Sequence, residues 1–266
     1  MPRSGTNWGS QILASCPDVR MKFCPLFSYE FKNRLDERST TEEWEQLFAE
    51  VYSTRSSYLD QDYLRRDGLV PTFENRAEQP TVLGIKSTRY HDLAGGLIGR
   101  WPSFRLIALV RHPVAAIHSW LTSGHEFPTE AEAREQWRSG MCRKGGPGEF
   151  WGYDDWKTTT REYLRLSEAY PEQVRLLAYD RLVRDPLSEV RALFRWAGLC
   201  FAGQTEDFLA RSSSGGDRHG RSVFKSPSVA ERWRAEAEPW LVQAIKDDLH
   251  DDPLGRFLQE PGGVLA

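Results

Sequence analysis

The sequence predicts an α/β protein whose core is a doubly wound parallel sheet flanked by helices. Three short, nearly continuous apolar runs predict strands buried on both faces, as the strands of a parallel sheet are: 81–85, 104–110 and 174–179. Helical patterns separate these runs, and strands that alternate with helices are typical of βαβ units. At roughly 150 residues per domain, 266 residues make one or two domains, and we expect a single domain over 1–266.

Six stretches have helical patterns: 6–14, 41–52, 113–120, 156–169, 186–197 and 229–249. Thr40 and Thr41 precede Glu42 and Glu43, which is typical of a capped helix start. Pro113 follows a strand directly and suits the first turn of a helix. The turn at 2–8 enters the first helix without room for a strand before it. We therefore expect the first strand of the sheet to be lacking or truncated, and a mis-called start codon explains this most simply.

The composition excludes several classes of protein. Apolar residues make up 39% and charged residues 27%, which excludes collagen-like, coiled-coil and wholly disordered chains. The net charge of −3 excludes a generally basic protein that coats nucleic acid. No apolar run is long enough to span a membrane. The start of the sequence has no apolar leader, and the 4 cysteines form no C-x-x-C pair. We therefore expect a cytoplasmic protein with reduced thiols, no zinc site, no nucleic-acid partner and no membrane span.

The first candidate site is the amino-terminal turn at 2–8. Gly5 lets the backbone wrap closely around an anion, and the hydroxyls of Ser4 and Thr6 can donate to it. The helix that begins there points its free N–H groups at the same place, and Arg3 adds a positive charge. The turn therefore predicts a phosphate cradle. It is not a Walker A loop, since G-x-x-x-x-G-K-[ST] is absent, and an ordinary capped helix is the alternative interpretation.

The second candidate site begins at Arg111, where a strand leaves the predicted sheet at its carboxyl end. Ligands of α/β proteins bind at this edge. Ser119 lies two helical turns further on and can face the same anion. A surface arginine and an unrelated helix serine are the alternative interpretation.

Taken together, these motifs resemble those of the PAPS-dependent sulfotransferases, where PAPS is 3′-phosphoadenosine 5′-phosphosulfate. Pro2-Arg3-Ser4-Gly5-Thr6 resembles their 5′-phosphosulfate loop, and Arg111 to Ser119 resembles their 3′-phosphate motif, R-x-P-x-x-x-x-x-S. A third stretch, at 174–194, resembles their Y-x-x-L-x-x-D-P block. The three stand in the family's order over nearly the whole chain, and their style is closest to bacterial and tyrosylprotein-type members. The resemblance implies a P-loop NTPase-like fold, PAPS as donor, PAP as product and no required metal.

The resemblance also implies roles for individual residues. The 3′-phosphate would be bound by Arg111 and Ser119, and Tyr179 matches a tyrosine that lines the nucleotide in tyrosylprotein-type members. The residues implied at the 5′-phosphosulfate are Arg3, Ser4, Gly5, Thr6 and Asn7. Trp8 is a candidate for stacking on adenine or acceptor, with core packing as its alternative. A late loop that resembles S-x-x-K-x-P adds Ser222, Lys225 and Arg232, although its spacing departs from the family pattern.

The candidates for the chemical step are Lys86, Arg3 and Glu30. Lys86 matches a lysine that the family places beside the transferring sulfuryl group, where negative charge collects as the S–O bond breaks. Glu30 is the candidate general base. It lies in the run Phe27-Ser28-Tyr29-Glu30-Phe31, and we expect the aromatic neighbours to raise the pKa of its carboxyl. His91 and His112 are the alternatives for the base.

The leading function is therefore transfer of a sulfuryl group from PAPS to a hydroxyl or amine of a small-molecule, carbohydrate or lipid acceptor. An Mg-ATP-dependent P-loop kinase or NTPase is a rival, because 176–180 imitates a Walker B strand that ends in an aspartate. The missing Gly-Lys-Ser/Thr and the presence of Arg111 stand against that rival. An inactive PAP- or nucleotide-binding module is the third interpretation.

Overall fold

A computed structural model of the chain describes residues 1–28, 30–215 and 219–259. They fall into two compact units, each built from separate stretches of sequence. Unit 1 comprises Met1–Gly5, Arg105–Arg184 and the described residues from Pro227 onward, whereas unit 2 comprises Thr6–Phe104 and Asp185–Ser226. Each unit has its own pair of parallel strands with helices around it. The predicted α/β class with parallel strands is confirmed.

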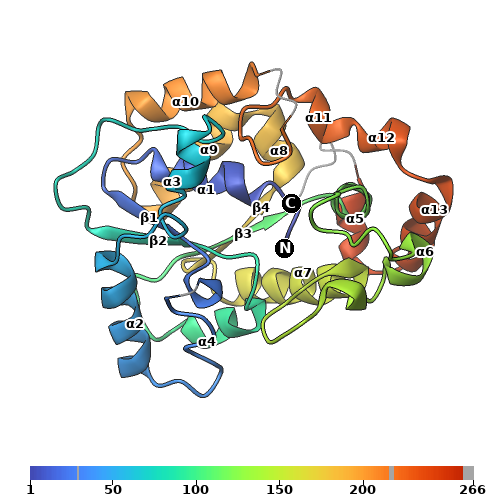
Figure 1. Cartoon of the computed structure of the whole chain (residues 1–266), viewed down its shortest axis with the longest axis horizontal. Helices are drawn as coiled ribbons and strands as arrows, with labels where there is room; N and C mark the ends of the chain where they lie inside the picture. The colour runs from blue at the N-terminus through green and yellow to red at the C-terminus, as the bar shows by residue number, and fades with distance from the viewer. Residues whose placement is uncertain (29, 216–218, 260–266) are drawn as a thin grey trace. The chain divides into compact units, whose positions relative to one another are not determined.

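In unit 2, strand β1 (Val19–Phe23) pairs in parallel with β2 (Val82–Lys86), and Val19 is opposite Val82 (Figure 1). Helix α1 (Thr6–Ala14) contacts both strands. The sequence patterns missed β1 because Arg20 and Lys22 interrupt its apolar residues. Within the described part of the chain no strand precedes α1, since Pro2–Gly5 form turns and bends.

Helix α2 (Thr41–Ser53) begins at a complete capping box: the Thr40 hydroxyl accepts from the Glu43 amide, and the Glu43 carboxylate accepts from the Thr40 amide. Its buried face enters the core of unit 2. The remaining helices of this unit are α3 (Asp62–Arg66), α4 (Ala94–Leu97), α9 (Pro186–Ala197) and α10 (Gly203–Ser213), with the short 3₁₀ turns η1 (Pro25–Phe27) and η2 (His91–Leu93). The prediction of a helix at 186–197 is confirmed, with Asp185 as its N-cap.

In unit 1, strand β3 (Leu106–Val110) pairs in parallel with β4 (Val174–Ala178). Helix α5 (Pro113–Leu121) follows β3 after two residues, and α7 (Gly152–Ala169) contacts both α5 and β4. Helix α8 (Tyr179–Arg184) begins directly after β4. Arg111 and Tyr179, which directly follow the two strands, therefore lie at the same edge of this strand pair, as parallel pairing requires.

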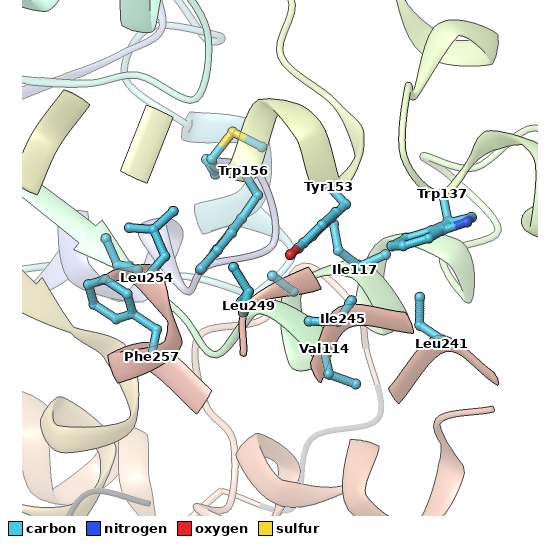
Figure 2. Close-up of a cluster of buried hydrophobic side chains, with 13 residues drawn as sticks. Val114, Ile117, Trp137, Tyr153, Trp156, Leu241, Ile245, Leu249, Leu254 and Phe257 are labelled. Carbon is cyan, nitrogen blue, oxygen red and sulfur yellow. The ribbon is translucent and has the colours of Figure 1, made fainter. Parts of the chain in front are cut away.

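The core of unit 1 holds α5 against α7 and α13 (Pro239–Asp248) (Figure 2). Trp137, Tyr153 and Trp156 line one side of it, and apolar residues of α13 and of the 3₁₀ helix η4 (Pro253–Leu258) line the other. Burying each large apolar side chain stabilises the fold by about 1.5–3 kcal/mol. The indole of Trp156 also donates to the backbone oxygen of Arg111 at 3.2 Å, which ties the core to the β3–α5 turn.

The prediction of one helix over 229–249 is wrong. The structure has three helices there: α11 (Ser228–Glu231), α12 (Trp233–Glu236) and α13. Proline disfavours the helical conformation in the residue before it, and Glu238, before Pro239, is at ψ 131°. Ala237 is also extended, at ψ 134°, so the chain turns before α13 begins. Unit 1 is completed by α6 (Ala133–Gln136) and the 3₁₀ turn η3 (Met141–Arg143).

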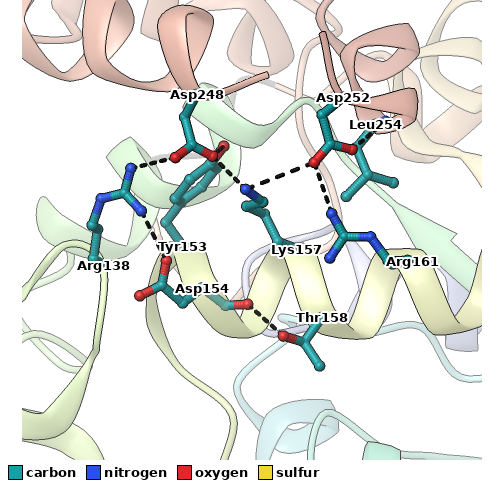
Figure 3. Close-up of polar contacts among 9 residues, drawn as sticks. All are labelled: Arg138, Tyr153, Asp154, Lys157, Thr158, Arg161, Asp248, Asp252 and Leu254. Carbon is teal, nitrogen blue, oxygen red and sulfur yellow. Dashed lines mark hydrogen bonds and ion pairs between the residues drawn. The ribbon is translucent and has the colours of Figure 1, made fainter. Parts of the chain in front are cut away.

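A charged network joins α7 to the end of α13 (Figure 3). The Asp248 carboxylate accepts hydrogen bonds from Arg138 at 2.6 Å, Tyr153 at 2.9 Å and Lys157 at 2.5 Å. Asp252 pairs with Arg161 at 2.7 Å. Burial favours protonation of Asp248, but these hydrogen bonds outweigh it and lower the pKa of the carboxyl to about 2. The charged groups of the network are therefore paired with one another, and they stabilise unit 1.

Candidate functional site

The amino-terminal turn of unit 1 has two residues in the left-handed region, Arg3 at φ 61° and Gly5 at φ 78°. Between them, Ser4 is 0% exposed, and its hydroxyl has no hydrogen-bond partner among the described residues. A buried hydroxyl is normally hydrogen-bonded, so this one is available for a ligand. Helix α1 begins at the next residue after Gly5, as the sequence predicts.

Gly5 is required at its position because the Tyr179 ring lies against it. A Cβ atom on Gly5 would be 2.1 Å from Cε2 of Tyr179, closer than any side chain allows. Burial raises the pKa of the Tyr179 phenol, so the ring stays neutral at physiological pH. The ring therefore forms a rigid wall of the turn, which brings the predicted first and third motifs into contact.

Arg111 lies in the turn between β3 and α5, and its side chain is half-buried. Its Nη1 donates to the backbone oxygen of Arg3 at 3.0 Å and its Nη2 to that of Ala230 at 3.4 Å. Its Nε is buried and has no partner within the described residues. Burial is the main cause of the lowered pKa of this guanidinium, which shows that its charge is poorly solvated. A half-buried cation with a buried, free donor is suited to an anionic ligand.

Ser119 and Arg3 complete this cluster in unit 1. Nε of Arg3 donates to Oγ of Ser119 at 3.1 Å, and Nη1 of Arg3 lies 3.4 Å from Oε2 of Glu126. The structure therefore brings together Arg3, Gly5, Arg111, Ser119 and Tyr179. Glu126 has no signal in the sequence, because a single glutamate in a polar loop carries no pattern.

Asp180 and His112 support the Arg111 turn. The Asp180 carboxylate accepts from the His112 amide at 3.3 Å, and burial raises the pKa of this carboxyl. This is the aspartate that imitates a Walker B residue. The His112 ring stacks on Trp233 with centroids 4.2 Å apart, and burial lowers the pKa of the ring to about 4, with the charge of Arg234 adding to the effect. The His112 ring is therefore a neutral packing element.

In unit 2, the residues that follow Gly5 hold the late loop. The Asn7 amide donates to the backbone oxygen of Arg221 at 3.2 Å, and the Trp8 indole donates to Ser212 Oγ at 2.9 Å. Ser222 is buried and accepts from the Phe224 amide at 3.1 Å. Lys225 donates through its backbone to Ser212 and through its ammonium to the Gly220 oxygen.

Three further residues of the sequence-predicted site remain. The Thr6 side chain is half-buried at the start of α1. In unit 1, Arg232 is exposed between α11 and α12 and pairs with Glu236 at 3.8 Å. In unit 2, Lys86 ends β2, and its backbone oxygen accepts from Cys24 at 2.7 Å. The half-buried ammonium of Lys86 makes no hydrogen bond or ion pair with any residue that the structure describes.

The candidate bases differ in their surroundings. Glu30 is exposed, and a hydrogen bond with the Ser56 side chain is the main cause of a lowered pKa. The expectation of a raised pKa is therefore wrong, because the carboxylate faces water and a hydrogen-bond donor instead of an apolar wall. His91 is buried, and burial lowers the pKa of its ring well below the usual range. Tyr29, part of the predicted aromatic wall, lies outside the described residues.

A polar chain leads from Glu30 into the core of unit 2. Ser56, which bonds to Glu30, donates its backbone amide to the Asp60 carboxylate at 3.0 Å. The same carboxylate pairs at 2.7 Å with Lys22 of β1, whose side chain is 0% exposed. Lys22, the buried charge that obscured β1 in the sequence, therefore pairs with Asp60. The Asp60 carboxylate also accepts from Ser56, the residue that bonds to Glu30.

Neither a metal-binding cluster nor a membrane-spanning helix is found among the described residues. No group of three or more His, Cys, Asp and Glu side chains there could hold a metal ion. No helix in the same part of the chain has both the length and the apolar character needed to cross a bilayer.

Comparison with known proteins identifies the family. A model of the sulfotransferase family matches residues 1–203. The fold is similar to that of mouse sulfotransferase SULT7A1 complexed with PAP, at a TM-score of 0.56 and 14% identity, covering 98% of this chain and 86% of that one. It is also similar to the sulfotransferase domain from the curacin biosynthetic pathway, at a TM-score of 0.50 and 19% identity, covering 94% of each chain. Among curated protein sequences, none matches. Because the family model spans most of the sequence, the chain belongs to the sulfotransferase family.

Proposed function

We propose that this protein transfers a sulfuryl group from PAPS to a hydroxyl or amine acceptor and releases PAP. The observation that carries the proposal is the buried Nε of Arg111, which has no partner among the described residues. This donor belongs to the motif that resembles the family's 3′-phosphate motif. A phosphate there would supply the missing acceptor and compensate the half-buried positive charge.

The 5′ end of the donor fits the amino-terminal turn. The buried Ser4 hydroxyl lacks a partner among the described residues, and the space beside Gly5 is closed to any larger side chain by Tyr179. Thr6 opens α1, whose first amides have no partner within the helix. We propose that Ser4, Gly5 and Thr6 bind the 5′-phosphosulfate. We propose Asn7, Trp8, Ser222 and Lys225 as nucleotide-binding residues on the family resemblance alone.

Lys86 is the proposed electrostatic residue for the transfer. When bound, PAPS supplies an SO₃ group whose S–O bond to the 5′-phosphate breaks as the acceptor oxygen or nitrogen bonds to sulfur. Negative charge then grows on the departing phosphate oxygen, and a positive group pointed there stabilises this state more than the ground state. The ammonium of Lys86 has no internal partner in the described structure, so it is available for this task.

Glu30 is the proposed acceptor of the proton that leaves the attacking hydroxyl or amine. Its lowered pKa keeps the carboxylate ionised at neutral pH, which is the state that a base needs. Its exposure leaves it accessible to an acceptor, whereas His91 is buried. We propose a small-molecule, carbohydrate or lipid acceptor.

The direct test is transfer of radiolabelled sulfuryl from PAPS to a panel that contains a phenol, a sugar and a lipid with free hydroxyls. The wild-type protein is expected to label at least one of them. Lys86→Ala is expected to lower turnover at least 100-fold while PAP binding, measured by calorimetry, changes less than threefold. Lys246→Ala, an exposed lysine on α13, is the matched control and should behave as wild type.

Two results would contradict the proposal in different ways. A wild-type protein that binds PAP but labels no acceptor would be an inactive nucleotide-binding module. A protein that binds ATP in preference to PAP would belong with the Mg-ATP-dependent enzymes.

A further inference from the structure

We infer that the buried ion pair of Lys22 and Asp60 holds the 54–60 loop of unit 2 against β1, and that Ser56 on this loop is a positioning residue for Glu30. The inference rests on the proposed function, because it concerns the group that is proposed to accept the proton. It also gives a task to a buried charge that the proposed reaction does not use.

The 54–60 loop connects α2 to α3 and contains no helix or strand. Its conformation therefore depends on hydrogen bonds, and several of them come from β1. The Lys22 ammonium donates to the backbone oxygen at the start of the loop, at position 54, and pairs at 2.7 Å with the Asp60 carboxylate at its end. In addition, the Phe23 amide donates to the Leu59 oxygen at 3.0 Å. One strand thus holds both ends of the loop.

The burial of Lys22 makes this attachment specific. The side chain is fully buried, so its charge depends on the partners that the loop supplies. A buried ion pair adds little net stability, because both charges lose their hydration, but separating the two leaves a buried charge without compensation. The pair therefore favours the one loop conformation in which Asp60 reaches Lys22. A site that must keep its groups in fixed positions needs such a constraint.

Ser56 is fixed inside this loop and reaches Glu30. Its backbone amide donates to the Asp60 carboxylate at 3.0 Å, and its backbone oxygen accepts from the Asp60 amide at 2.9 Å. Its hydroxyl oxygen accepts from the Leu59 amide at 3.4 Å, which leaves the O–H available to donate to the Glu30 carboxylate. Ser56 thus connects Glu30 to the buried ion pair through Asp60.

Ser56 has the largest effect among the groups around Glu30. Hydrogen bonds from Ser56, Ser28 and the Glu30 backbone lower the pKa of the Glu30 carboxyl, whereas partial burial and the charge of Asp60 raise it. The charge of Glu30 in turn acts on the phenol of Tyr58, another residue of the loop. Loss of the Ser56 hydroxyl should therefore raise the pKa of Glu30 and leave its carboxylate less well oriented.

The test compares Ser56→Ala with Ser57→Ala. Ser57 is the exposed neighbour, and its side chain makes no hydrogen bond with any residue that the structure describes. Turnover is measured with radiolabelled PAPS and the acceptor that the wild type labels best. Ser56→Ala is expected to lower kcat about tenfold and to change KM for PAPS less than about twofold, because a misplaced base slows proton removal but not donor binding. Ser57→Ala should match the wild type, and Ser56→Thr, which keeps the hydroxyl, should recover most of the loss.

Two further readouts distinguish positioning from a structural role. Because the pKa of Glu30 should rise in Ser56→Ala, the turnover of this variant relative to wild type should fall further as the pH is lowered from about 6 to 4.5. In the Glu30→Gln background, Ser56→Ala should lower turnover no further. A relative turnover that is constant with pH, or an undiminished loss in that background, would show that Ser56 does not act through Glu30.

A second arm tests the ion pair. Lys22→Met combined with Asp60→Leu replaces it by apolar side chains, an exchange that is often neutral for stability. This double variant is expected to melt near the wild-type temperature but to lose turnover as Ser56→Ala does, with no further loss when Ser56→Ala is added. Asp60→Asn, which keeps the shape of the side chain without its charge, should lose turnover in the same direction. Wild-type turnover in a folded variant of either kind would overturn the role of the ion pair.

The outcomes separate the inference from the proposed function. If the wild type labels no acceptor, the proposed function fails and the inference fails with it. If the wild type is active and Glu30→Gln keeps full turnover, sulfuryl transfer stands but Glu30 is not the base. If Glu30→Gln is impaired and Ser56→Ala behaves like Ser57→Ala, only the inference is overturned.

Discussion

The backbone oxygen of Arg3 accepts a hydrogen bond from the half-buried guanidinium of Arg111 at 3.0 Å. The two residues are 108 positions apart, and each belongs to a motif that the sequence associates with a phosphate of the donor. Nη1 of Arg111 makes this bond, whereas its Nε is buried and has no partner among the described residues. Arg111 thus shapes the amino-terminal turn and retains a buried donor for an anion.

Replacing Arg111 is expected to weaken binding of the 3′-phosphate selectively. A hydrogen bond from a charged group contributes about 2–3 kcal/mol, so Arg111→Ala should weaken PAP binding by about 30- to 150-fold. Arg111→Lys should recover little, because an ammonium cannot replace the fork that holds the oxygens of Arg3 and Ala230. Titration calorimetry with PAP and AMP checks this, and an equal loss for both nucleotides would contradict it.

Gly5→Ala is expected to destabilise the protein by about 2–4 kcal/mol, because the new methyl group would collide with Tyr179 and φ is positive. Gly99→Ala is the matched control: its φ is +82° but nothing lies within 4 Å of the added Cβ, so only backbone strain of about 1 kcal/mol remains. Urea denaturation measures both variants. In the Tyr179→Ala background the collision is gone, so Gly5→Ala should cost only about as much stability as Gly99→Ala does. A cost as large as in the presence of Tyr179 would argue against the close packing.

The proposed base predicts a simple pH dependence. Because the pKa of Glu30 is lowered from its ordinary value, its carboxylate stays ionised above about pH 4.5. Turnover should therefore show no acid limb from Glu30 between about pH 5.5 and 8, because this whole range lies above that pKa. Glu30→Gln should lower turnover about 100-fold or more across this whole range. A wild-type acid limb at about pH 6.5, retained in Glu30→Gln, would show that Glu30 is not the base; Glu37→Gln is the control.

The network around Asp248 predicts how stability depends on pH. The pKa of this carboxyl is about 2 in the folded protein, below its ordinary value of 3.8, so its contribution is complete above about pH 4 and is lost as the pH falls toward 2. Asp248→Asn should therefore lower the free energy of unfolding at pH 7 by about 2 kcal/mol. The difference from wild type, measured by urea denaturation, should shrink between about pH 4 and 2. Asp251→Asn, whose side chain is 96% exposed, should change little.

Much of the fold could be predicted because local signals agreed with the tertiary structure. Pro113 after an apolar strand marks α5, and Asp185-Pro186 marks α9. Strand β1 was missed for a physical reason: Lys22 is charged but fully buried, and its partner Asp60 lies far along the chain. Periodicity cannot reveal a polar residue whose burial depends on a distant counter-ion.

The site could be predicted at the level of motifs but not of side-chain surroundings. Gly5, Arg111 and Tyr179 lie close together, because each stands next to the end of a helix or strand whose position the pattern indicates. The pKa of Glu30 was wrongly predicted because neighbours in sequence were taken as neighbours in space. The contact of Arg3 with Ser119 and Glu126 depends on a left-handed residue and on a loop, and neither has a sequence signal.

The most direct test of the account is a crystal structure of the protein with PAP. The account predicts that the 3′-phosphate lies within hydrogen-bond distance of Arg111 Nε and Ser119 Oγ, while the 5′-phosphate sits on the amides and hydroxyls of the turn at Ser4–Thr6. Clear density for PAP with its 3′-phosphate away from both Arg111 and Ser119 would contradict it.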